Sequence, residues 1–264
     1  NSDDWFDSLY KIYRDISIRR VMGDNGRQLI EKDFTIQSRL SDFEEFISRT
    51  TQSVETIPLY QGFEKLEAYD ITVIIPYRNE EQSLDKTVTI ISQQTNLPKE
   101  VIFVNSSSTD GGSAFLNKWI EQHQGENGVH YRNIFEYTDT PSSSKNVGIR
   151  LAKTEWVAFM DCGLLFSKNW LESQIFYIKN SGLDIVSGVC DFSGTNVIDN
   201  CCSAHTHGYH RKRVVVPSTL VRKSVFEKVG LFLENRRSGY DHAWKIYLKK
   251  AGLVRGVNLD VVVS

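Results

Sequence analysis

The chain has 264 residues, of which 40% are hydrophobic, and a formal net charge of -2. This length and composition allow one large domain, or one domain with an appendage, around a substantial core. The balanced charge excludes the general basic field that attracts nucleic acid, and no apolar run approaches the roughly 20 residues that span a bilayer.

The four cysteines, Cys162, Cys190, Cys201 and Cys202, lie in the second half of the chain, and none forms a CxxC pair. This pattern argues against a disulfide framework and favours a reducing cytosol. The sequence begins without Met and without a signal-peptide pattern, so we expect an excised piece of a longer protein. We therefore expect a cytoplasmic location, with contact at the inner face of the membrane left open.

Residues 1–66 are polar and are predicted to be helical. Apolar residues recur at roughly helical spacing between Leu29 and Ile47, and Ser41 followed by Glu44 is a capping-box spacing at which a helix restarts. We expect an N-terminal helical extension over residues 1–66 and a second domain over residues 67–264.

From Asp70 onward, apolar strand-like runs alternate with helical patterns. Strands are predicted at 71–76, 100–105, 129–135, 155–161 and 183–190, and helices at 80–94, 113–123, 142–154 and 169–180. This alternation is typical of βαβ units. It predicts an α/β, Rossmann-like fold with a mostly parallel sheet flanked by helices.

The last third of the chain is less regular. We expect one strand near 213–221, a short helix from Ser224, a helix over 238–252 and a strand after it. Trp244, Tyr247 and Leu248 share one face of the longer helix, which ends at the stop signal Gly252. Asp241 falls in its first turn, where the helix dipole favours an anion.

Polar turns follow three of the predicted strands. In a parallel sheet, ligands bind beyond the carboxyl ends of the strands, so these turns should share one rim. The three turns are Pro76-Tyr77-Arg78, Asn105-Ser106-Ser107 and Asp161-Cys162-Gly163. The pattern alone therefore predicts a ligand site at this rim. The position of Ser107 on the rim favours a contact between this residue and the ligand.

Five stretches over residues 71–252 resemble the family 2 glycosyltransferases, which have the GT-A fold. They are VIIPYRNEEQSLDKTVTIISQQT, VIFVNSSSTDGG, SSSKNVGIRLAKTEWVAFMD followed by NWLE, PSTLVRKSVFEKVGLF, and SGYDHAWKIYLKKAG. Each stretch is weak alone, but all five occur in the order and spacing of the family. The resemblance implies a nucleotide-sugar donor bound at the rim and a glycan or lipid-linked acceptor.

The resemblance also implies roles for individual residues. The end of the first strand contacts the nucleobase, Asn105 stands where the family reads the base, and the KNVG helix start faces ribose or phosphate. Asp161 begins a DxD-like turn, and Asp241 inherits the role of catalytic base. The residues so implied are Pro76, Tyr77, Arg78, Glu80, Asn105, Lys145, Asn146, Asp161 and Asp241.

Three positions depart from the family pattern, because Asn105, Gly163 and Tyr240 stand where the family has acids. The Gly163 change removes the usual direct metal ligand. Asp161 and the donor diphosphate could still hold Mg²⁺ or Mn²⁺. Alternatively, cations could replace the metal. The stretch HTHGYHRKR could supply a metal-ligating His207 or a clamp of Lys and Arg side chains on the phosphates, and these possibilities stay open.

An inverting sugar transfer needs one carboxylate that takes the proton of the acceptor hydroxyl, and Asp241 is the candidate. The alternative is that Asp241 only stabilises its helix, and that the domain is a catalytically silent binding or scaffolding module. Residues 1–66 weakly resemble the carboxyl-terminal tail of family 4 glycosyltransferases with the GT-B fold. That resemblance implies an adjoining glycosyltransferase domain as a partner.

Overall fold

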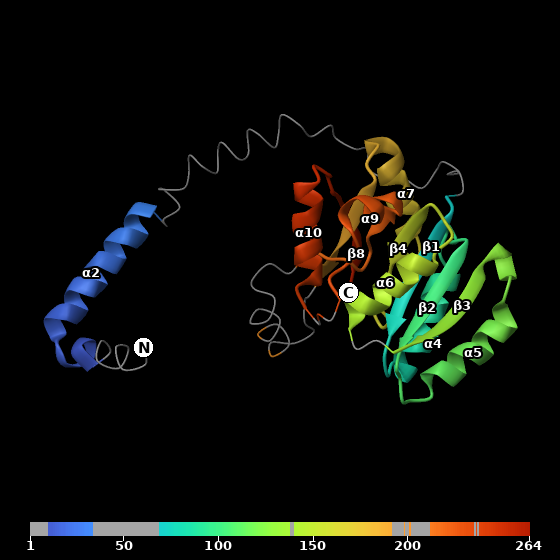
Figure 1. The fold of residues 1–264 in the computed structure, drawn as a ribbon, viewed down its shortest axis with the longest axis horizontal. Coiled ribbons are helices and arrows are strands. Elements are labelled where there is room, and N and C mark those ends of the chain that lie inside the picture. The colour runs from blue at the N-terminus through green and yellow to red at the C-terminus, as the bar shows by residue number, and fades with distance from the viewer. Residues whose placement is uncertain are drawn as a thin grey trace. The chain divides into compact units, whose positions relative to one another are not determined.

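A computed structural model of the chain describes residues 10–33, 69–137, 140–191, 212–234, 236 and 238–264, together with Ile198 and Cys201. The chain separates into two compact units, residues 1–57 and 58–264, and each is described by itself. Figure 1 shows the fold, with its elements labelled in chain order.

The first unit contains helix α2, Ile16–Asp33. Asp15 precedes it, and its carboxylate accepts the backbone N–H groups of Ser17 and Ile18. The Ser17 hydroxyl also donates to this carboxylate, and its hydrogen bond has the largest effect on the pKa of Asp15. Together the three hydrogen bonds hold this pKa below its ordinary value. Helix α2 lies within the predicted extension of residues 1–66, which stays a prediction, and the predicted restart at Ser41 lies outside the described residues.

The second unit is built on one mixed sheet. In the described residues the sheet has the order β3-β2-β1-β4-β7-β5-β6, and β8 pairs with β5. The strands are β1 Ile71–Tyr77, β2 Glu100–Ser106, β3 His130–Glu136, β4 Trp156–Phe159, β5 Ile185–Asp191, β6 Lys212–Val214, β7 Leu220–Arg222 and β8 Gly256–Val263. The helices are α4 Glu81–Ser92, α5 Gly112–His123, α6 Pro141–Leu151, α7 Trp170–Ser181, α9 Ser224–Val229 and α10 Tyr240–Lys250.

The predicted parallel sheet is confirmed for the first half of this unit. Strand β1 pairs in parallel with β2 and β4, and β2 pairs in parallel with β3. The prediction of one strand over 213–221 is wrong, because the segment forms two short strands, β6 and β7, which run antiparallel to β5. Pro217 cannot donate to a strand ladder, and Ser218 with φ +80° turns the chain between them.

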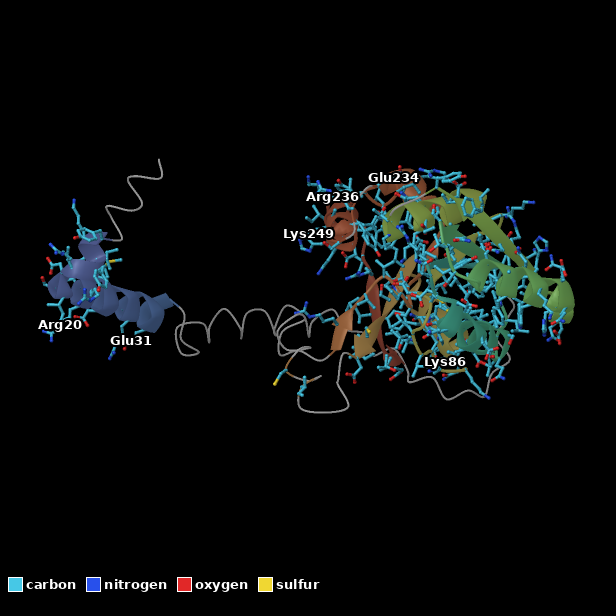
Figure 2. All side chains as sticks on the ribbon, turned by 90° about the horizontal axis from the view of Figure 1, so that it is seen from below. Arg20, Glu31, Lys86, Glu234, Arg236 and Lys249 are labelled. Atoms are coloured by element: carbon cyan, nitrogen blue, oxygen red, sulfur yellow. The ribbon has the colours of Figure 1, made fainter. Side chains whose placement is uncertain are left out.

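Helices cover both faces of the sheet, so the unit has three layers (Figure 1). Alternate residues of β1 point to opposite faces, as in any strand. Ile71, Val73 and Ile75 pack with apolar residues of α4, α5 and α7, while Ile74 packs with those of α6, α9 and α10. Charged side chains such as Lys86 of α4 and Lys249 of α10 project outward (Figure 2).

Helix α6 lies unusually close to the sheet. A Cβ atom on its Gly148 would stand 2.3 Å from Cγ2 of Ile74, so only glycine permits this approach. The helix begins with Pro141 in its first turn, and the Thr140 hydroxyl accepts the backbone N–H of Ser143 as a cap. The sequence of α6 therefore fixes where its polar first turns meet the ends of the strands.

Candidate functional site

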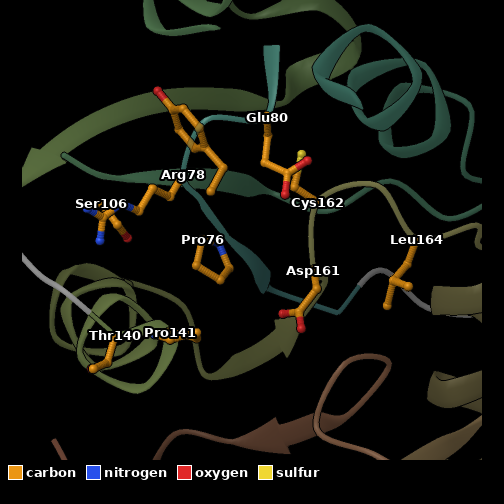
Figure 3. Close-up of a pocket in the computed structure, with 10 residues that line it drawn as sticks. Pro76, Arg78, Glu80, Ser106, Thr140, Pro141, Asp161, Cys162 and Leu164 are labelled. Carbon is orange, nitrogen blue, oxygen red and sulfur yellow. The ribbon is translucent and has the colours of Figure 1, made fainter. Parts of the chain in front are cut away.

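A cavity of about 530 Å³ lies at the carboxyl ends of β1, β2 and β4, next to the start of α6 (Figure 3). The three turns that the sequence places on one rim each contribute residues to it. The lining residues are Pro76, Tyr77, Arg78, Glu80, Ser106, Thr140, Pro141, Asp161, Cys162 and Leu164. This is the position at which ligands bind in open α/β sheets.

Five of the residues proposed from the sequence line this cavity: Pro76, Tyr77, Arg78, Glu80 and Asp161. Tyr77 is only 2% exposed, and its hydroxyl donates to Oδ1 of Asn133 at 2.9 Å. Burial raises the pKa of Tyr77. The ring is therefore a fixed part of the wall, whereas Arg78, which also lines the cavity, is exposed.

Besides Lys145, four other proposed residues do not line the cavity. Asn105 is buried and accepts the backbone N–H of Ser108 at 2.8 Å, so it shapes the turn after β2. Ser107 adopts φ +56° in the same turn. Asn146 is buried and exchanges hydrogen bonds with the backbone of Phe232, at 2.8 and 3.0 Å. Asp241 is exposed in the first turn of α10.

Sequence reasoning missed five lining residues: Ser106, Thr140, Pro141, Cys162 and Leu164. Thr140-Pro141 is a helix-start signal, and because α6 follows a strand its start belongs on the same rim. Ser106 and Cys162 stood in the rim turns but were not singled out. Leu164 gives no local signal, because its contact depends on how the chain leaves β4.

Lys145 lies beneath the cavity floor. Its side chain is fully buried, and Nζ donates to Oδ1 of Asp161 at 2.6 Å and to the hydroxyl of Tyr240 at 3.4 Å. Burial by itself lowers the pKa of Lys145, but the Asp161 carboxylate and the Tyr240 oxygen outweigh that effect and leave it raised. Lys145 is therefore a fixed positive charge against the inner oxygen of Asp161.

Comparison with known proteins identifies the domain that holds this cavity. Residues 72–200 match the model of glycosyl transferase family 2. This part of the chain belongs to that family. The glycosyltransferase domain thus contains β1 to β5, the Asp161 turn and the polar start of α6.

The curated relatives of this family 2 domain are distant and longer. An uncharacterized glycosyltransferase of Rickettsia bellii is 23% identical over 82% of the chain, and the match covers 33% of the relative. Glycosyltransferase AglE of Haloferax volcanii is 26% identical over 73% of the chain, and the match covers 65% of AglE. The chain thus spans a third to two thirds of the length of these relatives.

A solved structure shows the same fold. The mannosyltransferase PcManGT from Pyrobaculum calidifontis, solved with GDP-Man and Mn²⁺, superposes with a TM-score of 0.59 and 19% identity. The match covers 84% of the chain and 62% of PcManGT. The family 2 domain described here therefore has the GT-A fold, as its sequence predicts.

Asp161 is the one side chain of the Asp161-Cys162-Gly163 turn that offers a carboxylate to a divalent metal ion. Asp161 already accepts from Lys145 at Oδ1, and Gly163 offers no side chain. Burial raises the pKa of Cys162 to about 11, so its thiol is neutral at ordinary pH. Within the described residues, no three His, Cys, Asp or Glu side chains gather to hold a metal, and His207 lies outside them.

Gly163 adopts φ +85°, a conformation that favours glycine, and Glu80 lies beside it. A Cβ atom on Gly163 would stand 3.8 Å from Oε2 of Glu80. Figure 3 shows Glu80 reaching toward Cys162 and Asp161 facing the same cavity from the next turn. Two carboxylates and one guanidinium thus face this space, and the ammonium of Lys145 lies below it.

Proposed function

We propose that residues 67–264 bind a nucleotide-sugar donor in this cavity and transfer its sugar to a hydroxyl of an acceptor. One observation carries the proposal: within a family 2 glycosyltransferase domain, a cavity lined by Arg78, Glu80 and Asp161 lies at the carboxyl ends of β1, β2 and β4. PcManGT, which shares the fold, was solved with the nucleotide sugar GDP-Man. The nucleoside diphosphate is accordingly the part of the donor that the cavity should hold.

Two groups at the cavity, Arg78 and the start of helix α6, would attract a diphosphate, although Glu80 and Asp161 also line it. Arg78, whose side chain carries a positive guanidinium group, lines the cavity. Helix α6 starts at its edge with Thr140 and Pro141, and the N-terminus of a helix attracts anions. These groups would stabilise the charge that develops on the leaving diphosphate.

The proposed catalytic base is Asp241. Its neighbour Tyr240 touches Lys145, so the first turn of α10 lies at the same end of the sheet as Asp161. Asp241 would take the proton of the acceptor hydroxyl while that oxygen bonds to the anomeric carbon. The bond from carbon to diphosphate oxygen breaks at the same time, and its electron pair leaves with the nucleoside diphosphate. One such displacement inverts the anomeric centre.

The acceptor we propose is a glycan or lipid-linked hydroxyl, and an adjoining glycosyltransferase domain is the proposed partner. Cys162 and Cys190 are free thiols, which suits the cytoplasm that we propose as the location. None of the described helices combines the length and the apolar character needed to cross a bilayer.

Release of nucleoside diphosphate from a panel of UDP-, GDP- and dTDP-sugars tests the proposal. We expect Asp241→Asn to lower the turnover rate by about 10²–10⁴ at unchanged nucleotide affinity, because it removes the base but not the binding groups. Glu227→Gln is the matched control, since Glu227 is also an exposed acid in the first helical turn, of α9. Equal activity of Asp241→Asn and wild type would remove Asp241 from the mechanism.

A second candidate function rests on the position of Asp241, which does not line the cavity. A silent GT-A domain would serve as a scaffold and would need neither a base nor a donor. Calorimetric titration with UDP, GDP, dTDP and CDP separates the two. A folded protein that binds none of the four would favour the scaffold.

A further inference from the structure

Three side chains, those of Asp161, Lys145 and Tyr240, form a cluster at the cavity floor. Asp161 lines the cavity and is 35% exposed, while Lys145 beneath it is fully buried. Tyr240 approaches Lys145 from α10, with its hydroxyl 3.4 Å and its ring centroid 5.7 Å from Nζ. The cluster therefore joins the turn after β4 to the two helices α6 and α10.

The cluster carries no net charge. The ammonium of Lys145 balances the carboxylate of Asp161 at 2.6 Å. Burial raises the pKa of Tyr240, so its phenol stays neutral, and the raised pKa of Cys162 keeps the adjacent thiol neutral as well. An acidic side chain at position 240 would instead leave the cluster negative. Tyrosine gives Lys145 an oxygen to bond without adding that charge.

Lys145 also changes what Asp161 can bind. One carboxylate oxygen is held by the ammonium, and the exposed part of the side chain faces the cavity. A divalent cation there would lie one carboxylate group away from a fixed positive charge, which would repel it. A sugar or ribose hydroxyl, which is a neutral donor, meets no such repulsion.

We propose that Lys145 neutralises Asp161 from below, so that this site binds a nucleoside diphosphate without a divalent metal and Asp161 accepts a hydroxyl of the donor. Lys145 is a positioning residue, because Asp161 lies between it and the cavity. Close approach of a diphosphate to an unbalanced carboxylate would be repulsive, and the buried ammonium removes that repulsion. This inference rests on the proposed function, since it concerns the same nucleotide.

Calorimetric titration of the full chain with UDP, GDP, dTDP and CDP, in Mn²⁺ and again in EDTA, tests the inference. For the nucleotide that binds, we expect the dissociation constants in the two buffers to agree within about threefold. A threefold change corresponds to less than half of the free-energy change of a tenfold loss of affinity. Binding that requires Mn²⁺ would overturn the inference and leave the proposed function standing. Failure of all four nucleotides to bind would overturn the proposed function and this inference with it.

Lys145→Met removes the charge but keeps an unbranched stem of similar length. We expect its affinity for the nucleotide in EDTA to fall by about tenfold or more, and Mn²⁺ to restore it, because the exposed carboxylate can then take a metal. Lys145→Arg keeps the charge and should stay independent of Mn²⁺ wherever it binds. A loss of affinity in Lys145→Met that Mn²⁺ does not restore would mean that Lys145 has only a structural role.

A second pair of variants avoids the buried lysine. Tyr240 is half-buried and packs against Phe232, with ring centroids 5.6 Å apart, so Tyr240→Phe keeps the packing and the neutral charge. Tyr240→Glu adds a carboxylate beside Lys145. We expect nucleotide binding to depend on Mn²⁺ in Tyr240→Glu and not in Tyr240→Phe. The same response in both variants would contradict the charge argument.

Discussion

Two ion pairs of similar chemistry lie at opposite ends of the same sheet, and they differ in what their carboxylates can do. At the amino ends of the strands, the buried Glu100 accepts from Arg132 at one oxygen and from Thr72 at the other, at 3.0 and 2.9 Å. At the carboxyl ends, Asp161 accepts from Lys145 at one oxygen and faces a cavity. A carboxylate with both oxygens bonded inside the protein holds the fold together, whereas one with a free side is available to a ligand.

The largest effect on stability is expected at the amino-end pair. Glu100→Gln removes the charge that balances Arg132 and part of the bonding of Thr72, and we expect unfolding to become easier by about 2–3 kcal/mol. This value lies below the range for fully buried pairs because the Arg132 side chain is 24% exposed. Urea unfolding measures it, and nucleotide affinity should not change.

The control for Glu100 is Asp70→Asn. Asp70 pairs with Lys99 at 2.8 Å, but both side chains are more than half exposed, so its loss should cost less than about 1 kcal/mol. If Glu100→Gln altered nucleotide affinity while stability stayed the same, Glu100 would not be a structural residue. The contrast between a structural carboxylate at the amino ends of the strands and a ligand-binding carboxylate at the carboxyl ends would then be wrong.

An effect on both stability and nucleotide affinity is expected at Gly148, where helix α6 approaches β1 closely. The methyl group of Gly148→Ala would press against Ile74 and displace α6, at a cost of about 1–3 kcal/mol. Because Lys145 lies one turn earlier on α6, nucleotide affinity should fall as well. Urea unfolding and titration of the same sample measure both effects.

Gly26→Ala is the matched control, because it also adds a methyl group inside a helix, α2, but meets nothing within 4 Å. It should leave the second unit unchanged and raise the helix content slightly. A neutral Gly148→Ala would show that the close approach of α6 does not position the cluster.

Sequence periodicity predicted most of this fold because each strand and helix from β1 to α7 carries its own signal. Ile71–Tyr77 and Glu100–Ser106 are continuous apolar runs, as buried parallel strands require. The split between β6 and β7 was missed because it depends on a turn at Pro217 and on pairing with β5, which no local pattern reveals.

The site was predicted less completely than the fold. Topology alone brings the strand ends together, so Arg78 and Asp161 were found from the turns, whereas Glu80 was found from the resemblance to the family. The role of Asn146 was not, because its bonds to Phe232 join residues far apart in the sequence. The pairing of Lys145 with Asp161 likewise depends on the close approach of α6 to β1. Gly148 permits this approach, but a single glycine in the sequence does not predict it.

The smallest effect is expected at an exposed ion pair that supports the same region, Arg150 with Glu234 at 2.7 Å. The hydrogen bonds from Arg150 and then Asn146 lower the pKa of Glu234 below its ordinary value. A carboxyl group with a lowered pKa stabilises the fold above its unfolded pKa, and this contribution is lost as the pH falls through the folded pKa.

Glu234→Gln should therefore destabilise the protein by less than about 1 kcal/mol at pH 7, because both side chains are about half exposed. The difference from wild type should shrink from about pH 5 downward, as the wild-type carboxyl group takes up its proton. Urea unfolding of both proteins across this range measures the difference. A difference that grew on acidification would mean that Glu234 is repelled rather than stabilised in the folded state, and that Arg150 does not form the pair.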